Sequence, residues 1–312
     1  RGVVYSPRRI QVEVGGRFVT MRRQRFDHLL LEAALAEGVR LTTDKVTGIT
    51  ADEDPGVRLS LSDGGDLSAS YAVVATGANI SLLEPLGAVE NPTPTAYAFR
   101  QYFRSEKPLD RLVISYDRTI MPGYAWVFPL AENELNIGLG AEHGKTLNPR
   151  QALRQFMADF PLLREELGEL TPISKLRGAN LRCGLCGSRP VAARRVLAVG
   201  DAIGAIFPFT GEGIGKALET GEIAADVLQI ALETGEPERV AEFETRIEQL
   251  RDKYLGYLVA ERWLSRAWLA DLVLARIRRS RALKQQLEDL VNETADPRRI
   301  FSPLGLLRSV FS

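Results

Sequence analysis

A short stretch late in the chain combines an apolar run, an aspartate and a cluster of glycines. The sequence VLAVGDAIG begins at Val196, and its apolar residues lead directly to Gly200 and Asp201. An aspartate there can offer its carboxylate to a hydroxyl-rich ligand beyond the carboxyl end of a sheet, where open α/β folds bind their ligands. Pro208 then fixes a turn, and glycines open the following helix at three positions: Gly211, Gly213 and Gly215. The unpaired N–H groups and the positive end of such a helix favour partially negative ligand atoms.

Two other interpretations of this stretch compete with a ligand site. In the first, the glycines only ease packing in an ordinary strand–loop–helix connection. In the second, Gly211-x-Gly213 is a fragment of the G-x-G-x-x-G turn that binds a dinucleotide pyrophosphate. However, Gly211 lies ten positions after Asp201 and position 216 holds Lys, so this fingerprint fails.

Composition and charge limit the classes of protein that fit. The 312 residues suffice for one large core or two, and 45% apolar with 26% charged residues is ordinary for a globular protein. Forty basic residues balance forty acidic ones, so no net field attracts nucleic acid, and we predict no nucleic-acid partner. His28 and His143 are the only histidines, and we predict no metal site. Two cysteines, no secretory signal and no long apolar run favour a cytoplasmic location.

The first third of the chain is typical of strands with one helix. We predict paired opening strands with a hairpin turn at Gly15 and Gly16, then a helix that starts at Arg23 and stops at Gly38. One face of this helix is apolar and carries Phe26, Leu29, Leu30, Ala33 and Ala34. The run YAVVATGA (71–78) predicts a strand buried on both faces of a parallel sheet.

The middle and the end of the chain differ from this pattern. From Thr93, apolar and polar residues alternate, which predicts an antiparallel sheet in a separate lobe. A helix with Asn148 as N-cap and Pro149 at its first position follows, and most later residues favour helices. The predicted fold class is α/β (α+β), with an antiparallel-sheet lobe and a C-terminal helical region.

Several motifs resemble those of one family. GDAIGAIFPFTGEGIGKALETGEIAA resembles the second flavin motif of the glutathione-reductase-type FAD oxidoreductases. That resemblance implies that Asp201 binds the ribityl chain, and that the backbone of residues 211–214 faces the pyrimidine edge of the flavin. RRQRFDHLLL resembles the family's R-x-x-F-D helix, while KVTGI and YAVVATGA resemble strands that flank the adenosine. The cofactor-binding residues implied are Arg23, Val46, Thr76, Gly77, Gly200, Asp201, Pro208, Gly211, Gly213 and Ile214.

A second motif lies in the antiparallel region. GYAWVFPLAENELNIGLG places Tyr124, Trp126 and Phe128 on one face of a strand, because side chains alternate there. Alternation alone favours an ordinary sheet core over an apolar wall for a ligand. The spacing, however, resembles the Y-x-W-x-F-P…G-x-G signature of geranylgeranyl reductases, which reduce isolated double bonds in long isoprenoid chains. The substrate-binding residues implied are Tyr124, Trp126, Phe128, Pro129, Gly138 and Gly140.

One part of the family pattern is not found in the sequence. Nothing supplies the amino-terminal G-x-G-x-x-G turn that cradles the FAD pyrophosphate. We therefore expect the 312-residue chain by itself to bind FAD weakly and to expose an apolar sheet edge. RCGLCG also places Cys183 and Cys186 as a single C-x-x-C pair, too few ligands for zinc. Idle or buried thiols are the favoured interpretation, and a redox pair is the minor one.

The terminal helices mix aromatic and basic residues. They carry Trp263, Leu264, Trp268 and Leu272 among Arg262, Arg266, Arg276, Arg278 and Arg279. Such helices can lie in a membrane interface, which would make the protein membrane-associated, or they can cap the substrate lobe. Capping is the more common arrangement.

These observations predict an FAD-dependent oxidoreductase of the geranylgeranyl reductase type, acting in lipid biosynthesis. The resemblance implies hydride transfer from the flavin to an alkene of an isoprenoid small molecule, with NADPH or ferredoxin as electron donor. No side chain stands out as the proton donor. The alternatives are a flavin monooxygenase or halogenase acting on an aromatic ring, although the halogenase W-x-W-x-I-P signature is absent, and a non-catalytic binding remnant.

Four segments are expected along the chain. Part of the FAD-binding domain occupies residues 1–90, and the antiparallel-sheet substrate domain occupies residues 91–190. The chain then returns to the FAD-binding domain over residues 191–235 and ends in a helical region over residues 236–312.

Overall fold

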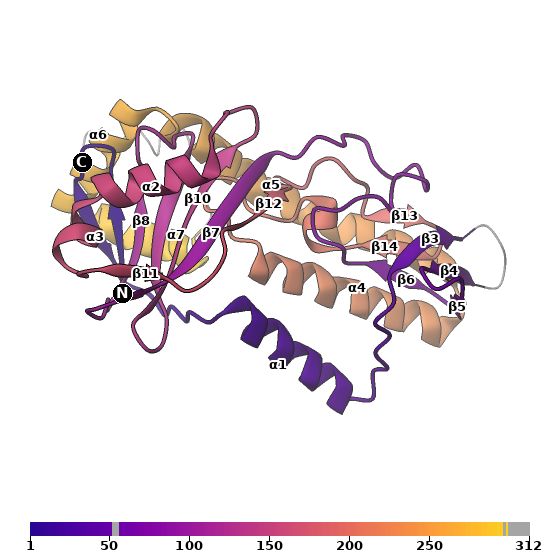
Figure 1. Cartoon of the computed structure of the whole chain (residues 1–312). Helices are drawn as coiled ribbons and strands as arrows, with labels where there is room; N and C mark the ends of the chain where they lie inside the picture. The colour runs from indigo at the N-terminus through magenta and orange to yellow at the C-terminus, as the bar shows by residue number, and fades with distance from the viewer. Residues whose placement is uncertain (52–55, 296–297, 299–312) are drawn as a thin grey trace. The chain divides into compact units, whose positions relative to one another are not determined.

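The computed structural model describes residues 1–51, 56–295 and 298, and the chain divides into two compact units (Figure 1). The first, the sheet unit, comprises Arg1–Arg40, Tyr97–Ala179 and Val259–Ser312. The second, the strand–helix unit, comprises Leu41–Ala96 and Asn180–Leu258. Residues 296–297 and 299–312 of the expected C-terminal helical region lie outside the described residues.

The sheet unit is built on a large sheet whose strands follow the order β11–β7–β10–β9–β8–β1–β2. Their bounds are β11 (Leu170–Pro172), β7 (Ala96–Ser105), β10 (Glu134–Glu142), β9 (Gly123–Pro129), β8 (Leu112–Ser115), β1 (Gly2–Tyr5) and β2 (Gln11–Val14). A further strand, β12 (Arg177–Leu181), pairs with β7. Pairing is antiparallel between β8, β9 and β10, as the alternating pattern predicts, and parallel between β1 and β8. The predicted antiparallel lobe is confirmed.

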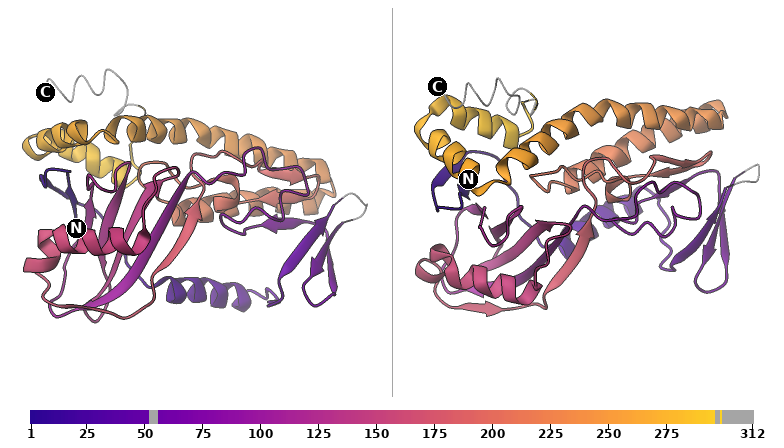
Figure 2. Two further views of the ribbon diagram at one scale, coloured as in Figure 1. Left: turned by 45° about the horizontal axis from the view of Figure 1, so that its top comes forward. Right: turned by 90° about the horizontal axis from the view of Figure 1, so that it is seen from above.

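Two helices, α2 (Pro149–Asp159) and α3 (Pro161–Glu165), cover one face of this sheet (Figures 1 and 2). Asn148 caps α2 by accepting the Gln151 N–H at 3.1 Å, and Pro149 takes the first helical position, both as predicted. The inward side chains of α2 meet those of the strands in one core that includes Phe156, Val113 and Ile137.

The β1–β2 hairpin does not turn where the sequence predicts. The strands pair as expected, but they are joined through residues 6–10, where the Ser6 N–H donates to Ile10 O at 2.9 Å. The predicted turn at Gly15–Gly16 is wrong, because the Gly15 N–H instead binds Glu288 Oε1 of α7 (Arg281–Val291) at 2.7 Å. Helices α6 (Ala267–Arg279) and α7 pack on β2.

Helix α1 (Arg23–Ala36) forms where predicted, and Gly38 follows it with a φ of +90°. Its apolar stripe, however, has no partner of its own: within the described residues α1 buries no side chain, and Leu29 and Leu30 are exposed. Helical periodicity thus predicts which residues form the apolar stripe, but it does not predict which element packs on them.

The strand–helix unit contains two small sheets. One has the order β13 (Val191–Ala193), β14 (Val196–Ala198), β6 (Ala72–Val74); the other has the order β3 (Val46–Thr50), β4 (Val57–Leu61), β5 (Asp66–Ala69). A turn at residues 63–65 joins β4 to β5. Strand β6 pairs parallel to β14 as expected. The prediction that this strand is buried on both faces is wrong, because Val73 is 42% exposed.

Helical segments complete this unit. A short turn of 3-10 helix, η1 (Gly200–Ile203), follows β14, and α4 (Ile214–Thr234) begins after the glycine-rich loop. A second 3-10 turn, η2 (Pro237–Val240), leads into α5 (Ala241–Leu264), within which the boundary between the two units falls.

Candidate functional site

The carboxyl ends of two parallel strands meet in the strand–helix unit. Val74 of β6 pairs with Ala198 of β14, and the Val199 N–H donates to Val74 O at 3.1 Å. The predicted pairs Thr76–Gly77 and Gly200–Asp201 therefore leave the sheet at the same edge. Ligands of open α/β sheets bind beyond such an edge.

Gly200 allows helix α4 to approach the end of β14 closely. Its φ is +62°, and a Cβ there would lie 3.2 Å from the Ala217 Cβ of α4. The Gly200 N–H donates to Thr220 Oγ1 at 3.0 Å, within a buried contact between strand end and helix. Glycine at this position thus serves packing, as the simpler interpretation proposed, and it also sets the direction in which Asp201 leaves the strand.

Asp201 lies beside the start of α4. Gly213 is the N-cap of that helix, and a Cβ on Gly213 would lie 3.8 Å from Asp201 Oδ1 and 2.9 Å from Ile206 Cγ1. A larger residue at this position would therefore press on Ile206 of the loop, while its Cβ would meet the carboxylate at ordinary contact distance. A carboxylate at a helix N-terminus is favoured by the helix dipole, which helps to hold the side chain in place.

The loop between Asp201 and α4 is held by a pair of tyrosines that the sequence analysis did not identify. The fully buried Phe207 ring lies 4.6 Å from the Tyr254 ring and 4.4 Å from the Tyr257 ring, centroid to centroid. Tyr254 Oη also donates to Ala205 O at 2.7 Å. Tyr254 and Tyr257 are three residues apart on α5, so the sequence predicts that they share a helix face. This spacing does not indicate which residue packs against that face.

The same loop is bound from a second direction by the turn that contains the cysteines. The Gly184 N–H donates to Ile206 O at 3.0 Å, and the Leu185 N–H donates to Gly204 O at 2.8 Å. Cys183 is half-buried, and Cys186 is exposed and directs its Sγ to Cys183 O at 3.0 Å. Partial burial raises the pKa of the Cys186 thiol, against the opposing effect of Arg182 and Arg251.

The first amides at the helix start are partly used by the protein itself. Gly211 has a φ of +68°, and its N–H donates to Phe207 O at 3.1 Å. The Gly215 N–H donates to Glu212 Oε1 at 2.7 Å, so a side chain caps this end of α4. The resemblance implies that the backbone of residues 211–214 faces the flavin. Within this span the Gly211 N–H is already bonded inside the loop, while Ile214 is exposed.

The remaining predicted cofactor residues lie elsewhere. Val46 begins β3, in the other sheet of the strand–helix unit. Arg23 belongs to the sheet unit, where its Nε lies 3.0 Å from Asp27 Oδ1 on the next turn of α1. Its neighbour Arg22, which the sequence analysis passed over, makes the stronger contact: two nitrogens lie 2.7 and 2.6 Å from the carboxylate of Glu134.

The aromatic residues of the second motif form a continuous row on β9. The ring centroids of Tyr124 and Trp126 are 6.1 Å apart, and those of Trp126 and Phe128 are 6.2 Å apart. Tyr116 extends the row, 6.1 Å from Tyr124, and burial raises the pKa of its phenol, so that it stays neutral. We call Tyr116, Tyr124, Trp126 and Phe128 the aromatic wall.

The aromatic wall is not part of the core. Ala125 and Val127, which alternate with it along β9, are fully buried in the cluster that contains Phe156 of α2. The wall therefore lies on the opposite face of the sheet, where its rings are half-buried. Alternation alone favoured a sheet core for these rings, and the core is instead made by the residues between them.

Two glycines of β10 provide the floor on which Trp126 lies. Gly138 pairs with Trp126 and Gly140 with Tyr124 across the two strands. A Cβ on Gly138 would lie 2.3 Å from Trp126 Cζ2, whereas one on Gly140 would lie 3.8 Å from the same ring. The indole N–H donates to Asn136 Oδ1 at 3.2 Å, which sets the ring's orientation. Glycine at 138 is thus needed for Trp126 to lie flat on the strand.

The end of the wall is closed by the segment that precedes α1. Thr20 Oγ1 donates to Pro129 O, and the Arg22 guanidinium stacks on Tyr102 of β7 with its central carbon 5.0 Å from the ring centroid. Tyr102 also carries Arg100 over its ring at 4.2 Å. These contacts fix the chain beside Pro129.

The donor groups that could hold a metal were also considered. Within residues 1–51, 56–295 and 298, no group of three or more His, Cys, Asp or Glu side chains is arranged to hold a metal ion. Nor, over those same residues, does a helix have the length and apolar character that crossing a bilayer requires.

A strand end with Gly-Asp, a glycine-led helix start and a braced loop between them suit the ribityl chain and one edge of a flavin. The class to which the chain belongs agrees with this: it is a member of the FAD dependent oxidoreductase family, whose sequence profile matches residues 18–227. The predicted family and fold class are confirmed.

Individual relatives have more specific names than the family as a whole. The chain is 30% identical to the menaquinone reductase of Mycolicibacterium smegmatis over 222 residues, covering 66% of this chain and 53% of that protein. It is 28% identical over 253 residues to digeranylgeranylglycerophospholipid reductase 1 of Methanopyrus kandleri, covering 75% of this chain and 64% of the relative. The chain spans about half the length of curated relatives such as the menaquinone reductases.

Solved structures share the fold. A geranylgeranyl bacteriochlorophyll reductase-like protein from Thermoplasma acidophilum superposes with a TM-score of 0.73 at 21% identity, covering 99% of this chain and 78% of that one. The halogenase PltM superposes with a TM-score of 0.65 at 19% identity, covering 92% of this chain and 63% of the other. At these identities the likeness concerns the fold alone.

Proposed function

We propose that the protein takes part in the FAD-dependent reduction of carbon–carbon double bonds in isoprenoid chains. The observation that carries this proposal is the aromatic wall, with Trp126 lying flat over Gly138 on the face of the sheet away from α2. A half-buried row of rings offers apolar contact along its length, which suits a polyprenyl chain better than a small polar ring.

The chain's own residues have separate tasks in this proposal. The carboxylate of Asp201 accepts hydrogen bonds from ribityl hydroxyls, and the start of α4 at Gly213 and Ile214 faces the electron-rich edge of the flavin. Pro208 and Gly211 hold the loop in shape, and Thr76 and Gly77 lie at the same sheet edge on the adenosine side. When bound and reduced by NADPH or ferredoxin as electron donor, the FAD cofactor would supply the hydride.

The remaining assigned residues complete the proposal. Arg23 and Val46 contribute to the cofactor site, while Tyr124, Trp126, Phe128 and Pro129 line the substrate with Gly138 and Gly140 beneath them. The wall holds the isoprenoid and excludes water from the part of the chain that it contacts.

Substrate binding can be tested without turnover. In the double variant Trp263→Phe/Trp268→Phe, Trp126 is the only tryptophan, and geranylgeraniol should quench or shift its fluorescence. Phe128→Ala in that background should weaken the response about tenfold or more, since a buried aromatic contact is lost. Leu67→Ala, on β5, serves as the control. A signal that does not change with geranylgeraniol would contradict the proposal.

A second candidate is oxygen-dependent chemistry on an aromatic ring, which the fold likeness to the halogenase PltM favours. An assay of the chain with FAD and a reductant distinguishes alkene reduction from oxygen-dependent chemistry. Alkene reduction without oxygen supports the first, and oxygen-dependent change of a phenol without alkene reduction supports the second. Binding of both ligands with neither reaction supports a non-catalytic binding role.

A further inference from the structure

The junction of α5 and α6 presents two tryptophans to solvent. Trp263, in the last turn of α5, is 41% exposed, and Trp268, in the first turn of α6, is 65% exposed. The turn between them is closed by Arg266, whose carbonyl accepts the N–H groups of Leu269 and Ala270 at 3.0 Å. Tryptophan is among the costliest side chains to leave in water, so this exposure calls for an explanation.

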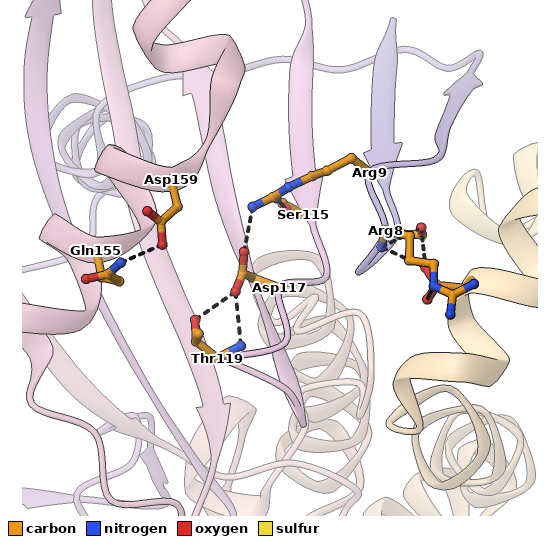
Figure 3. Close-up of polar contacts among 9 residues, drawn as sticks. Arg8, Arg9, Ser115, Asp117, Thr119, Gln155 and Asp159 are labelled. Carbon is orange, nitrogen blue, oxygen red and sulfur yellow. Dashed lines mark hydrogen bonds and ion pairs between the residues drawn. The ribbon is translucent and has the colours of Figure 1, made fainter.

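The orientation of α6 is fixed by its inner face. Leu269, Ala270 and Leu274 are buried, and Leu274 packs against β2. The buried carboxylate of Asp271 accepts Ser6 Oγ at 2.6 Å and the Arg8 N–H at 2.8 Å, and Figure 3 shows Arg8 held against this helix. The helix therefore cannot turn its tryptophan inward without breaking a buried polar contact.

The outer face of α6 consequently has a defined composition. Leu272 and Arg279 lie four and eleven residues after Trp268, so the three side chains share one helix face. Leu272 and Arg279 are exposed, as is Arg262 at the end of α5. Leu264, which the sequence placed in the same group, is buried instead. We call Arg262, Trp263, Arg266, Trp268, Leu272 and Arg279 the tryptophan corner.

The charge around the tryptophan corner is one-sided. Between residues 261 and 281 the chain has arginines at 262, 266, 276, 278, 279 and 281, and its acids in that range are Glu261 and Asp271. Asp271 faces inward, where Arg8 and Arg118 lie 3.6 and 3.9 Å from its Oδ2. The Arg266 guanidinium lies 5.3 Å from the centre of the Trp263 ring, so cation and indole act as one unit.

We propose that the tryptophan corner docks on the surface of a bilayer that contains anionic phospholipids. Indole rings settle at the level of the lipid headgroups, and arginines beside them bind lipid phosphates, so each component of the corner has a matching partner there. An ordinary protein groove would match the apolar side chains but not the unbalanced arginines. The contact lies on the membrane without spanning it, and it does not depend on the reaction proposed above.

The test uses the full 312-residue chain and vesicles of phosphatidylcholine with or without phosphatidylglycerol. The chain should float with the phosphatidylglycerol vesicles and bind phosphatidylcholine alone far more weakly, and added salt should release it. The variants are Trp263→Ala/Trp268→Ala and Arg262→Ala/Arg266→Ala. Each should lower the vesicle partition coefficient by about tenfold or more.

Matched controls remove the same groups elsewhere. Leu67→Ala/Leu232→Ala deletes exposed apolar side chains, and Arg25→Ala/Arg40→Ala deletes exposed arginines. Both controls should bind vesicles like the parent chain, and circular dichroism of all variants should match it. Binding that is absent, or equal in the parent and the tryptophan variant, overturns the proposal. So does a dimer in vesicle-free solution that the tryptophan variant abolishes, because the corner would then be covered by a second copy.

Discussion

The sheet unit and the strand–helix unit differ in how their apolar surfaces are covered. In the sheet unit, strands β7 to β10 present fully buried side chains such as Val113, Val127 and Ile137 to helices of the same unit. In the strand–helix unit, small sheets leave apolar side chains such as Val73 and Leu67 exposed.

The loop of the strand–helix unit is nevertheless well braced. Phe207 lies between tyrosines of α5, and the turn at Gly184 and Leu185 binds the loop from another side. This loop is held by the tyrosines and the neighbouring turn, whereas strands β7 to β10 are held by the core that they share with α2 and α3. The aromatic wall and the loop between Asp201 and α4 are therefore stabilised by different means, and they should respond differently to mutation.

The largest effects should come from deleting one buried ring in each unit. Phe156→Ala removes a side chain from the sheet core, and Phe207→Ala removes the centre of the clamp; each should cost about 3–5 kcal/mol of local stability. Hydrogen exchange followed by peptide mass spectrometry should show lost protection in β7–β10 for the first and in residues 200–214 for the second. If Phe156→Ala loosened both regions equally, the two units would unfold as one.

A smaller effect is expected on cofactor affinity. Asp201→Ala should weaken FAD binding by about 1.5–3 kcal/mol, roughly 10- to 100-fold in Kd, because hydrogen bonds to a charged acceptor are lost. Titration calorimetry at high protein concentration measures this, with Asp66→Ala of β5 as the control. An unchanged Kd would remove Asp201 from the cofactor site and leave the loop as a packing device.

The two glycines of β10 give a matched pair within the sheet unit. Gly138→Ala should destabilise the protein by about 1–3 kcal/mol, because its Cβ would overlap Trp126, and it should also shift the emission of that ring. Gly140→Ala places its Cβ at ordinary contact distance and should change stability by less than about 0.5 kcal/mol. Equal effects at the two positions would mean that Trp126 does not lie flat on the strand.

The smallest expected effect concerns the thiol beside the clamp. Since burial raises the pKa of Cys186, less of it is thiolate near pH 8 than in an ordinary thiol. Its alkylation by iodoacetamide should therefore be slower than that of glutathione at pH 8 and should keep rising as the pH passes the ordinary thiol range. Alkylation faster than glutathione at neutral pH would favour the redox-pair interpretation of the C-x-x-C motif.

The sequence was most informative where geometry depends on neighbours along the chain. The alternation of side chains along β9 predicts that Trp126 and Val127 lie on opposite faces of the sheet. The Asn148–Pro149 pair predicts the start of α2. Both predictions are confirmed because they depend on local backbone geometry. The sequence prediction failed at Gly15–Gly16, because the real turn is stabilised by Ser6 bonded to Asp271, 265 residues away. A contact of that range leaves no local pattern.

The residues of the candidate site divide in the same way. Gly200, Asp201 and Gly213 could be selected from one continuous stretch, whereas the tyrosine clamp and the Arg22–Glu134 pair depend on which elements meet in space. Likewise, the spacing of apolar residues predicts the apolar stripe of α1. Whether other elements cover this stripe cannot be read from the spacing, and within the described residues no side chain of α1 is buried.

The link between Ser6 and Asp271 also bears on the order in which the protein is made. Strand β1 pairs with β8, and the β1–β2 turn is closed by a carboxylate on α6, so residues 2–10 need partners that leave the ribosome much later. Such non-local contacts fold slowly and leave strands exposed in the meantime. The nascent sheet unit is therefore expected to depend on chaperones until α6 emerges, a dependence that ribosome-bound chains truncated before and after Asp271 would reveal.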